Sequence, residues 1–329
     1  MNPPLLSIIM IVYNSELYIA EAIESILNQT CKDFEFIIID DGSTDNSIKI
    51  IKSYSDSRIR FLSNKTNRGI VYSRNRGLEE AKGEFVGMFD SDDVAYRSKF
   101  EEQINFLNSH QDYGMIGSWV EWIDENGNNS GKGWKLDAAS EYIPAIMLFR
   151  NYFVQSAVLY RSECISGRRF QEGLEIGEDY QLWLDICQLH KVWNLPKYLV
   201  KYRIHLQSTT SNKSALKRYD KNLFTGLFEQ LGIEASDEEI ELHIMLRYDA
   251  TIRSGRILIG ISNWLEKIIV QNKTSKVYNH AILTKVAFNR WLKSCYMARS
   301  MVFKTAFIFV TSRILRLYLV SVIKSLGRS

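Results

Sequence analysis

Cysteine is scarce in this chain, and its few cysteines form no pattern typical of a disulfide framework or a zinc site. Cys31, Cys164, Cys187 and Cys295 are far apart, without two-residue spacings and without histidines at zinc-site intervals. This distribution favours reduced thiols in the cytoplasm. The N-terminus also lacks a basic segment and a small-residue cleavage site, so we expect no secretory leader.

Long apolar runs are missing too, and acidic residues are missing toward the C-terminus. No stretch of about eighteen uncharged apolar residues occurs, so the sequence predicts no membrane-spanning helix. Residues 267–329 contain twelve Lys or Arg and no Asp or Glu, whereas the first 266 residues contain 29 basic and 38 acidic residues, a net charge of −9. The C-terminal region is therefore chemically distinct from the rest of the chain.

Residues 313–328 have the spacing of a basic amphipathic helix. Its basic side is formed by Arg313, Arg316, Lys324 and Arg328, and its apolar side by Ile314, Leu315, Tyr318, Leu319 and Val322. Such a helix favours peripheral contact with an anionic membrane surface, on the inner face of the cell membrane. The alternatives are packing on the domain and packing in a homo-oligomer. No nucleic-acid recognition module accompanies the charge, so we expect no nucleic-acid partner.

Strands alternate with helices in the first hundred residues. Apolar runs at residues 6–12, 34–41, 59–62 and 85–89 are typical of buried strands, and helical spacings follow at 15–27, 47–54 and 71–81. This alternation predicts an α/β fold with a mostly parallel sheet covered by helices on both faces. In such sheets ligands bind beyond the carboxyl ends of the strands.

The last of these strands ends in three closely spaced carboxylates, in the sequence FVGMFDSDD. Asp90, Asp92 and Asp93 repel one another, because two unit charges about 4 Å apart cost roughly 4 kcal/mol at an effective dielectric near 20. Carboxylate oxygens suit Mg²⁺ or Mn²⁺, so we expect a divalent cation there. The alternative is a solvated turn, which is less favoured because polar clusters end three consecutive strands.

The following hundred residues predict further strands and a second acidic site. Strands are expected at residues 115–124 and 152–160, with a hairpin turn after the first, and two short strands flank a Pro turn within residues 192–205. Glu178 and Asp179 open a helix, where acidic residues are ordinary partners of the helix dipole. From residue 214 onward we expect helices, among them 219–231 and 237–254.

Four of these motifs together resemble glycosyltransferase family 2. They are SIIMIVYN, DDGSTD, NRGIVYSRNRGL and FDSDD, in the family's order and spacing. The family usually has Pro where Ile11 stands, a departure that removes no functional group. The resemblance implies the GT-A fold, a Rossmann-like sheet, over residues 1–212. Residues 1–95 would form the nucleotide-sugar-binding half and 96–212 the acceptor-binding half, followed by a helical, basic region at 213–329.

The resemblance implies a nucleotide site at the first two strand ends. Val12, Tyr13 and Asn14 would line the base and ribose, where Tyr13 offers an aromatic body with a polar tip. Asp40 and Asp41 would accept hydrogen bonds from a uracil N–H or the ribose hydroxyls, since a carboxylate is an acceptor.

It also implies three basic residues near the diphosphate. Arg74 would reach the base or the diphosphate, and Arg203 would neutralise phosphate charge. His205 would cover the diphosphate or complete the metal shell through a ring nitrogen. Surface positions without a ligand are the alternative for Arg74 and His205.

The remaining roles divide between two acidic groups. Asp92, with Asp90 or Asp93, would hold the metal ion, and Asp179 would be the general base for the acceptor hydroxyl, with Glu178 orienting it. A positioned base typically contributes 10² to 10⁴ in rate. The resemblance thus implies a metal-dependent, inverting transfer from a nucleoside-diphosphate sugar, UDP-linked, to a glycan or lipid-linked acceptor, which we expect to belong to surface polysaccharide biosynthesis. The alternatives are a sugar nucleotidyltransferase and a silent scaffold that retains the fold.

Overall fold

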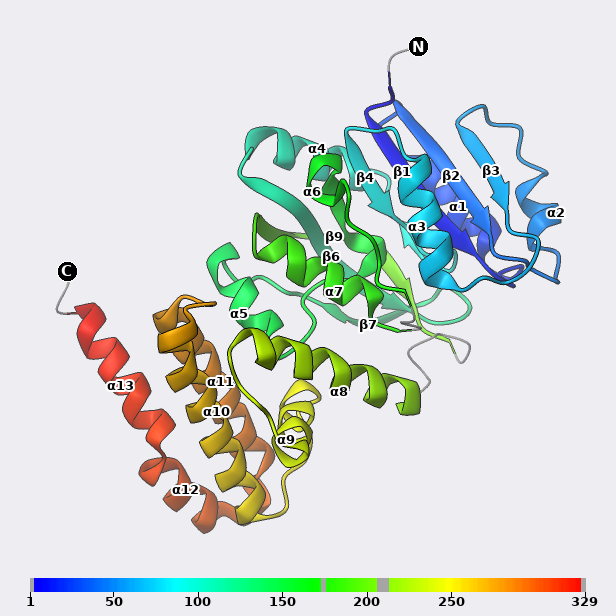
Figure 1. Cartoon of the computed structure of the whole chain (residues 1–329). Helices are drawn as coiled ribbons and strands as arrows, with labels where there is room; N and C mark the ends of the chain where they lie inside the picture. Colours follow the sequence, from blue (N-terminus) through cyan, green and yellow to red (C-terminus); the bar gives the residue numbers. More distant parts are fainter. Residues whose placement is uncertain (1–2, 173–175, 206–212, 327–329) are drawn as a thin grey trace. The chain divides into compact units, whose positions relative to one another are not determined.

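The computed structural model describes residues 3–172, 176–205 and 213–326 and divides the chain into two compact units (Figure 1). One unit comprises Met1–Ser140 and Phe153–Lys213, and the other comprises Glu141–Tyr152 and Ser214–Ser329. The first is built on one sheet and the second is helical. Residues 141–152, which we expected in the acceptor-binding half, group with the C-terminal helices.

The first unit follows the expected alternation of strands and helices. Its strands are β1 (Leu6–Val12), β2 (Phe34–Asp40), β3 (Ile59–Ser63), β4 (Phe85–Met88), β5 (Val94–Ala95), β6 (Tyr113–Ile123), β7 (Asn129–Trp134), β8 (Leu159–Arg161) and β9 (Lys191–Arg203). Its helices are α1 (Ile19–Leu27), α2 (Ser47–Ile51), α3 (Ile70–Glu80), α4 (Lys99–Ser109), α6 (Ser162–Ile165) and α7 (Glu178–Cys187), with a 3₁₀ turn at Gln155–Ala157.

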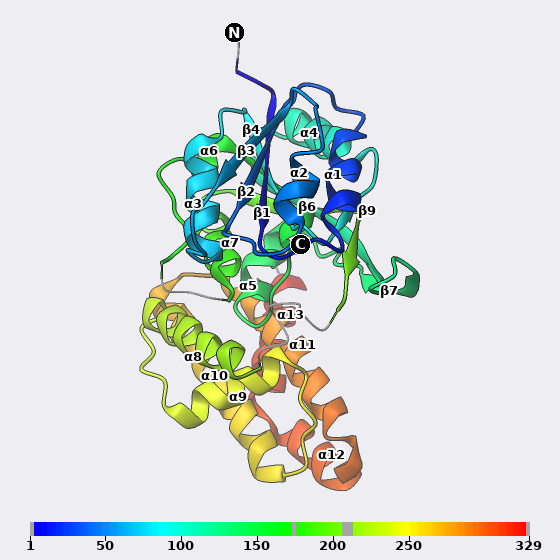
Figure 2. The ribbon, with the colours of Figure 1, turned by 90° about the vertical axis from the view of Figure 1, so that its right-hand side faces the viewer.

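In the described residues these strands form a nine-stranded sheet in the order β3-β2-β1-β4-β8-β6-β9-β5, with β7 paired to β6. The four N-terminal strands are parallel, whereas β8 is antiparallel to both β4 and β6. The sheet is thus parallel in its N-terminal half and mixed beyond it. Figure 2 shows α3 and α6 on one face of the sheet and α1 and α4 on the other, which confirms the α/β expectation.

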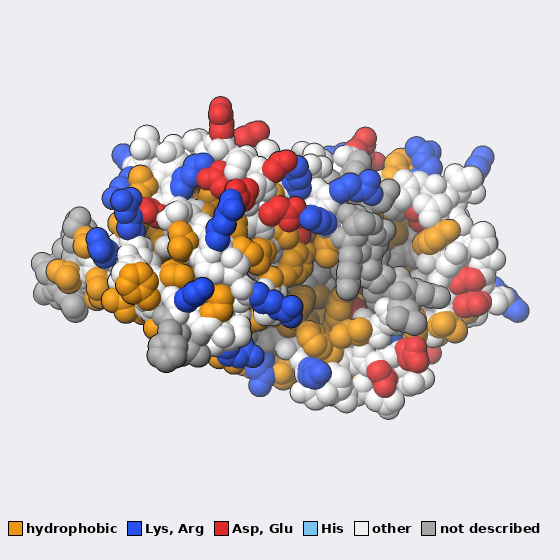
Figure 3. Space-filling model, turned by 90° about the horizontal axis from the view of Figure 1, so that it is seen from below, with side chains coloured by type: hydrophobic (Ala, Val, Ile, Leu, Met, Phe, Trp, Pro, Cys, Tyr) orange, Lys and Arg blue, Asp and Glu red, His pale blue; other side chains and the backbone are white. Residues whose placement is uncertain are grey.

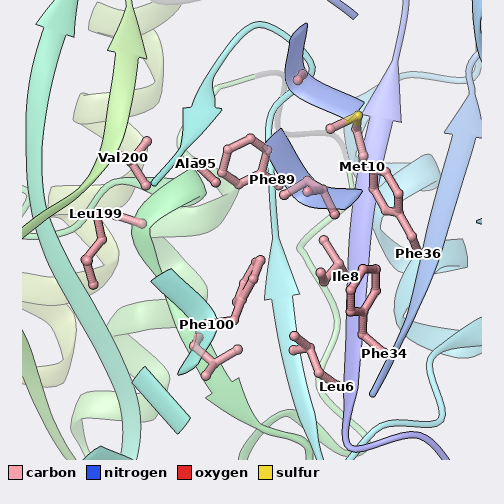
Figure 4. Close-up of a cluster of buried hydrophobic side chains, with 14 of the residues drawn as sticks. Leu6, Ile8, Met10, Phe34, Phe36, Phe89, Ala95, Phe100, Leu199 and Val200 are labelled. Atoms are coloured by element: carbon pink, nitrogen blue, oxygen red, sulfur yellow. The ribbon is translucent and has the colours of Figure 1, made fainter. Parts of the chain in front are cut away.

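Burial on both faces explains why the first strands are continuous apolar runs. Every residue of β2 is buried, and Phe34 and Phe36 pack with Met10 of β1 in the cluster drawn in Figure 4. Phe89 and Phe100 belong to the same cluster. Since Phe89 is buried and precedes Asp90 directly, the core fixes the position of the aspartate cluster.

Two strand predictions in the second half of this unit need correction. Within residues 152–160 a 3₁₀ turn occupies Gln155–Ala157, and the regular strand is limited to β8, which begins at Leu159. A short buried apolar run does not by itself specify a strand. Residues 191–203 form one continuous strand. Its pairing with β6 shifts between Leu195 and Tyr198, so a bulge accommodates Pro196, which has no N–H to donate.

The second unit consists of helices. They are α5 (Ile143–Met147), α8 (Lys213–Gln230), α9 (Asp237–Arg247), α10 (Gly255–Ser275), α11 (His280–Met297), α12 (Val302–Thr311) and α13 (Arg313–Leu326). α9 begins at a Ser236–Glu239 capping box and ends seven residues before the expected end at residue 254.

Buried His243 explains why residues 141–152 belong to this unit. Its Nε2 donates to the carbonyl of Leu148, and its Nδ1 accepts from the indole of Trp264. Burial lowers the pKa of His243 to about 3, so the ring is neutral. This neutral form can donate on one nitrogen and accept on the other.

Candidate active site

Asp90 and Asp92 lie just after β4, and their carboxylates remain accessible to solvent. Their side chains are 34% and 30% exposed. The N–H of Asp90 donates to the hydroxyl of Ser156, which holds the backbone beyond the strand. Nε2 of His205 lies 2.9 Å from Oδ2 of Asp92, so the structure brings together two residues that are far apart in the sequence.

Asp93 differs from its neighbours because it is buried. Its Oδ1 accepts the backbone N–H of Arg203 at 2.9 Å. Desolvation by burial raises the pKa of Asp93 well above its usual range, and the charges of Asp92 and Asp90 raise it further. These contacts indicate that Asp93 positions the end of β9, whereas the accessible oxygens belong to Asp90 and Asp92.

Arg203 is also buried, and its expected phosphate contact stays a prediction. Its guanidinium donates to the carbonyls of Asp92 and Asp124 and to the carboxylate of Glu21. It lies 4.7 Å from the ring centroid of Tyr18, and the same ring packs at 5.0 Å against His205. Arg203 therefore holds the loop that carries Asp92, and Tyr18 supports His205 beside it.

At the end of β2, Asp40 and Asp41 are fully buried and their carboxylates accept hydrogen bonds from the chain itself. Asp40 accepts from the N–H groups of Gly42 and Ser43. Gly42 has a φ of 79°, and a Cβ there would lie 2.6 Å from the backbone of Asn67, so the turn requires glycine.

Asp41 holds the loop between β3 and α3. Its oxygens accept from Nδ2 of Asn64 at 2.6 Å and from the backbone N–H groups of Arg68 and Gly69 at 2.9 Å each. The contact of Asp40 and Asp41 with uracil or ribose stays a prediction. Both carboxylates are occupied in shaping the loops of the nucleotide half.

The end of β1 remains the accessible part of the predicted nucleotide site. Val12 is buried, whereas Tyr13 is exposed and Asn14 adopts a φ of 50°, unusual for a residue other than glycine. The Asn14 side chain accepts the N–H of Thr44, and its own N–H donates to Ser43. These two bonds fasten the ends of β1 and β2 together and leave the Tyr13 ring in solvent.

Arg74 links the two acidic groups that the sequence predicted as separate. The side chain is buried on α3, where one nitrogen donates to Oε1 of Glu178 and another to Oδ1 of Asp90 at 3.1 Å. Partial burial raises the pKa of Asp90, and the guanidinium opposes this rise. Arg74 thus bridges Asp90 and Glu178, and its contact with base or diphosphate stays a prediction.

Asp179 occupies the first turn of α7 and is partly exposed, beside buried Glu178. Its Oδ1 accepts the N–H of Tyr180 at 2.7 Å. Desolvation raises the pKa of Asp179 to about 7, with a further contribution from Glu178. A carboxylate with this pKa can accept a proton near neutral pH, as a general base must.

Buried aromatic side chains fix the position of α7. Trp183 is fully buried, and its indole N–H donates to the hydroxyl of Tyr160 on β8 at 2.7 Å. No sequence pattern predicted this contact, nor the contacts of Tyr18 and Glu21 with Arg203. Each of these residues is an aromatic or acidic residue on a helix or strand, and no local pattern distinguishes it from ordinary core or surface residues.

The donor set at Asp90 and Asp92 fits a Mg²⁺ or Mn²⁺ ion that is completed by other ligands. In the described parts of the chain no three His, Cys, Asp or Glu side chains converge into a complete metal cage. Mg²⁺ commonly takes one or two protein carboxylates and fills its shell with water and phosphate oxygens. Two accessible carboxylates meet that requirement, and a contribution from buried Asp93 stays a prediction.

Solved structures with a similar fold bind nucleotide sugars. The S. aureus TarS 1–349 structure in complex with UDP-GlcNAc has a TM-score of 0.59 at 18% identity and covers 89% of both chains. A mannosyltransferase from Pyrobaculum calidifontis, solved with GDP-Man and Mn²⁺, has a TM-score of 0.56 at 14% identity, covering 94% of this chain and 88% of the other. The sheet and its covering helices therefore define a protein of the GT-A class.

Sequence comparisons then place the chain in a family. The family model described as glycosyl transferase family 2 matches residues 7–170. An uncharacterized glycosyltransferase of Haemophilus influenzae is 33% identical over 250 residues, covering 71% of this chain and 77% of the relative. The putative glycosyltransferase EpsE of Bacillus subtilis is 33% identical over 207 residues, covering 61% and 73%. The chain belongs to glycosyltransferase family 2 and is a glycosyltransferase, as the motifs predicted.

Proposed function

We propose that this enzyme transfers a sugar from a nucleoside-diphosphate sugar to an acceptor hydroxyl with inversion at the anomeric carbon, and that Asp179 is the base. Asp179 takes the proton of the acceptor hydroxyl, and the oxygen attacks the anomeric carbon. The bond from that carbon to the diphosphate oxygen breaks, and its electron pair leaves with the diphosphate. The observation that carries this proposal is the partly exposed Asp179, with a pKa near 7, on a helix fixed by buried aromatic residues.

Asp92 and Asp90 would hold a Mn²⁺ or Mg²⁺ ion on the leaving-group side. Such an ion, when bound, stabilises the negative charge that develops on the diphosphate. His205 supports this assignment, because its ring nitrogen orients the Asp92 carboxylate at 2.9 Å. Arg74 positions both acidic groups, since it bonds to Asp90 and to Glu178 beside the base.

For the donor we propose a UDP-sugar, and for the acceptor a lipid-linked saccharide of a surface polysaccharide. The UDP-GlcNAc complex of the TarS fold supports the donor class. The basic, acid-free region at residues 267–329 supports an acceptor held at the cytoplasmic face of an anionic membrane.

The experiment that tests this proposal is a donor screen with the full-length enzyme. UDP-, GDP- and dTDP-sugars are incubated with Mn²⁺, with Mg²⁺ or with EDTA, and release of the nucleoside diphosphate is measured. We expect release from UDP-sugars that requires the metal. Pyrophosphate consumption or formation would instead indicate a nucleotidyltransferase, and neither binding nor turnover of any donor would indicate a scaffold.

A further inference from the structure

Helices α12 and α13 of the C-terminal unit expose large apolar side chains to solvent. Phe307 and Val310 on α12 are 71% and 66% exposed, and Ile323 on α13 is 67% exposed. Leu319 and Val320 are half exposed. Residues three or four apart lie on the same face of a helix, so each helix presents one apolar face to water. We call these five residues the α12–α13 surface.

This face of α13 is distinct from the one that packs on its own unit. Ile314 is fully buried, and the ring of Tyr318 stacks on Phe288 of α11 with centroids 4.0 Å apart. The apolar side predicted from the sequence is therefore corrected, because Ile314 and Tyr318 face the unit and Leu319 faces solvent. The predicted basic residues Lys324 and Arg328 lie outside the described side chains.

Exposed basic side chains lie on the same faces of α12 and α13 as the exposed apolar ones. Lys304 precedes Phe307 by three residues, and Arg316 precedes Leu319 by three, and both are exposed. Arg313 is exposed as well and lies 3.2 Å from Glu266 of α10. Figure 3 shows Lys and Arg side chains beside hydrophobic ones over this end of the chain. Since residues 267–329 contain no acidic residue, no negative charge of this segment offsets them.

A shallow apolar recess lies where α11 meets α12. Its volume is about 360 Å³. It is lined by Leu292, Cys295, Arg299, Thr305, Ala306 and Phe309. An acyl chain complements such a recess, and the guanidinium of Arg299 suits the phosphate of a lipid headgroup.

We propose that the α12–α13 surface docks on a bilayer that contains anionic lipid. Amphipathic helices with basic residues beside the apolar face lie in the plane of such an interface. A second copy of this chain is a poorer occupant, because a two-fold interface would bring two basic surfaces together without an acidic residue of this segment between them. In the described residues no single helix has the length and apolar composition of a membrane span. The segments Lys304–Thr311 and Arg313–Ile323 have that length and composition only when taken together, and they are bent by 46° relative to each other.

This inference deepens the proposed function, since a lipid-linked acceptor would be held at the same membrane, but its test does not depend on sugar transfer. The full-length protein is sedimented with vesicles of phosphatidylcholine containing about a third phosphatidylglycerol, and with phosphatidylcholine alone. We expect binding to the anionic vesicles that weakens as salt screens the charge. Absence of binding to anionic vesicles at low salt would overturn the proposal.

The decisive variant combines Phe307→Ser with Ile323→Ser. Both side chains are largely in water, so the variant should melt like the wild type while its vesicle affinity falls at least tenfold. The matched control, Ile259→Ser with Val270→Ser, removes two half-exposed apolar side chains from α10 and should leave affinity unchanged. Arg316→Gln should weaken binding about fivefold, the equivalent of one basic residue near an anionic surface.

Two results would contradict the assignment. Equal vesicle affinity of the wild type and the Phe307→Ser, Ile323→Ser variant would show that another surface binds. A dimer that the double variant dissociates, seen by light scattering in the absence of vesicle binding, would assign the surface to a second copy.

Discussion

Two pairs of aspartates lie at the ends of strands β2 and β4 at one edge of the sheet, and the two pairs differ in burial and in their hydrogen-bond partners. After β2, Asp40 and Asp41 are buried, and their oxygens accept backbone N–H groups of neighbouring loops. After β4, Asp90 and Asp92 stay about a third exposed, and their side-chain contacts are charged or titratable side chains, Arg74 and His205. Burial and the nature of the hydrogen-bond partner, more than position on the edge, therefore distinguish a structural carboxylate from one that can meet a ligand.

The largest effect on activity is expected at Asp179, an acidic residue outside the two strand ends. Asp179→Asn should lower kcat about 10² to 10⁴-fold, because the variant keeps the shape of the side chain but cannot accept the proton. The measurement is steady-state transfer with the donor found by the screen. Asp185→Asn on the same helix is the matched control and should retain the wild-type rate. Normal transfer by Asp179→Asn would show that another group is the base.

The second prediction compares the stability contributions of the two strand ends. Asp41→Ala should lower the free energy of unfolding by about 3 kcal/mol, because donors from Asn64, Arg68 and Gly69 lose their acceptor in a buried loop. Asp92→Ala should cost less than about 1 kcal/mol, since no backbone N–H of the described residues donates to the Asp92 carboxylate. Urea unfolding of both variants measures the difference. Equal losses would contradict the distinction between the strand ends.

The smallest expected effect is a shift in pH dependence. The transfer rate should rise with pH as Asp179 loses its proton, with a midpoint near its pKa of about 7. The Arg74 cation lowers the pKa of Asp179, so Arg74→Gln should move the midpoint to higher pH. Arg76→Gln on the same helix is the control, because Arg76 bonds to Ser63 and Asn64 instead. If the pH midpoint of the transfer rate is unchanged in Arg74→Gln, Arg74 does not position the base.

The sequence predicted most of the sheet unit, and the reasons are local. Apolar runs such as residues 6–12 and 34–40 are rich in β-branched or aromatic residues and are followed by turn signals, which favours strands, and the four motifs indicated the family. Residues 152–160 and 191–203 were less predictable. Their form depends on pairing with β6 and β4, and a one-dimensional pattern does not record which partner a strand will have.

The sequence placed the candidate site residues at the strand ends but did not show their contacts within the chain. The motifs correctly located the strand ends, yet they could not reveal that Asp40, Asp41 and Arg203 would be buried and occupied by the chain itself. Arg74 illustrates the reason, because its partners Asp90 and Glu178 are 16 and 104 residues away in the sequence. Burial and such distant pairings arise only when the whole unit has folded.

We propose that Asp90 and Asp92, which follow β4, hold the metal ion at the leaving group, whereas Asp179 accepts the proton of the acceptor. Isothermal titration of UDP in the presence and absence of Mn²⁺ tests it most directly, in the wild type, Asp92→Asn and Asp179→Asn. We predict that Mn²⁺ strengthens UDP binding at least tenfold in the wild type and in Asp179→Asn, and has no such effect in Asp92→Asn. Full Mn²⁺ dependence in Asp92→Asn, or its loss in Asp179→Asn, would contradict this division of roles.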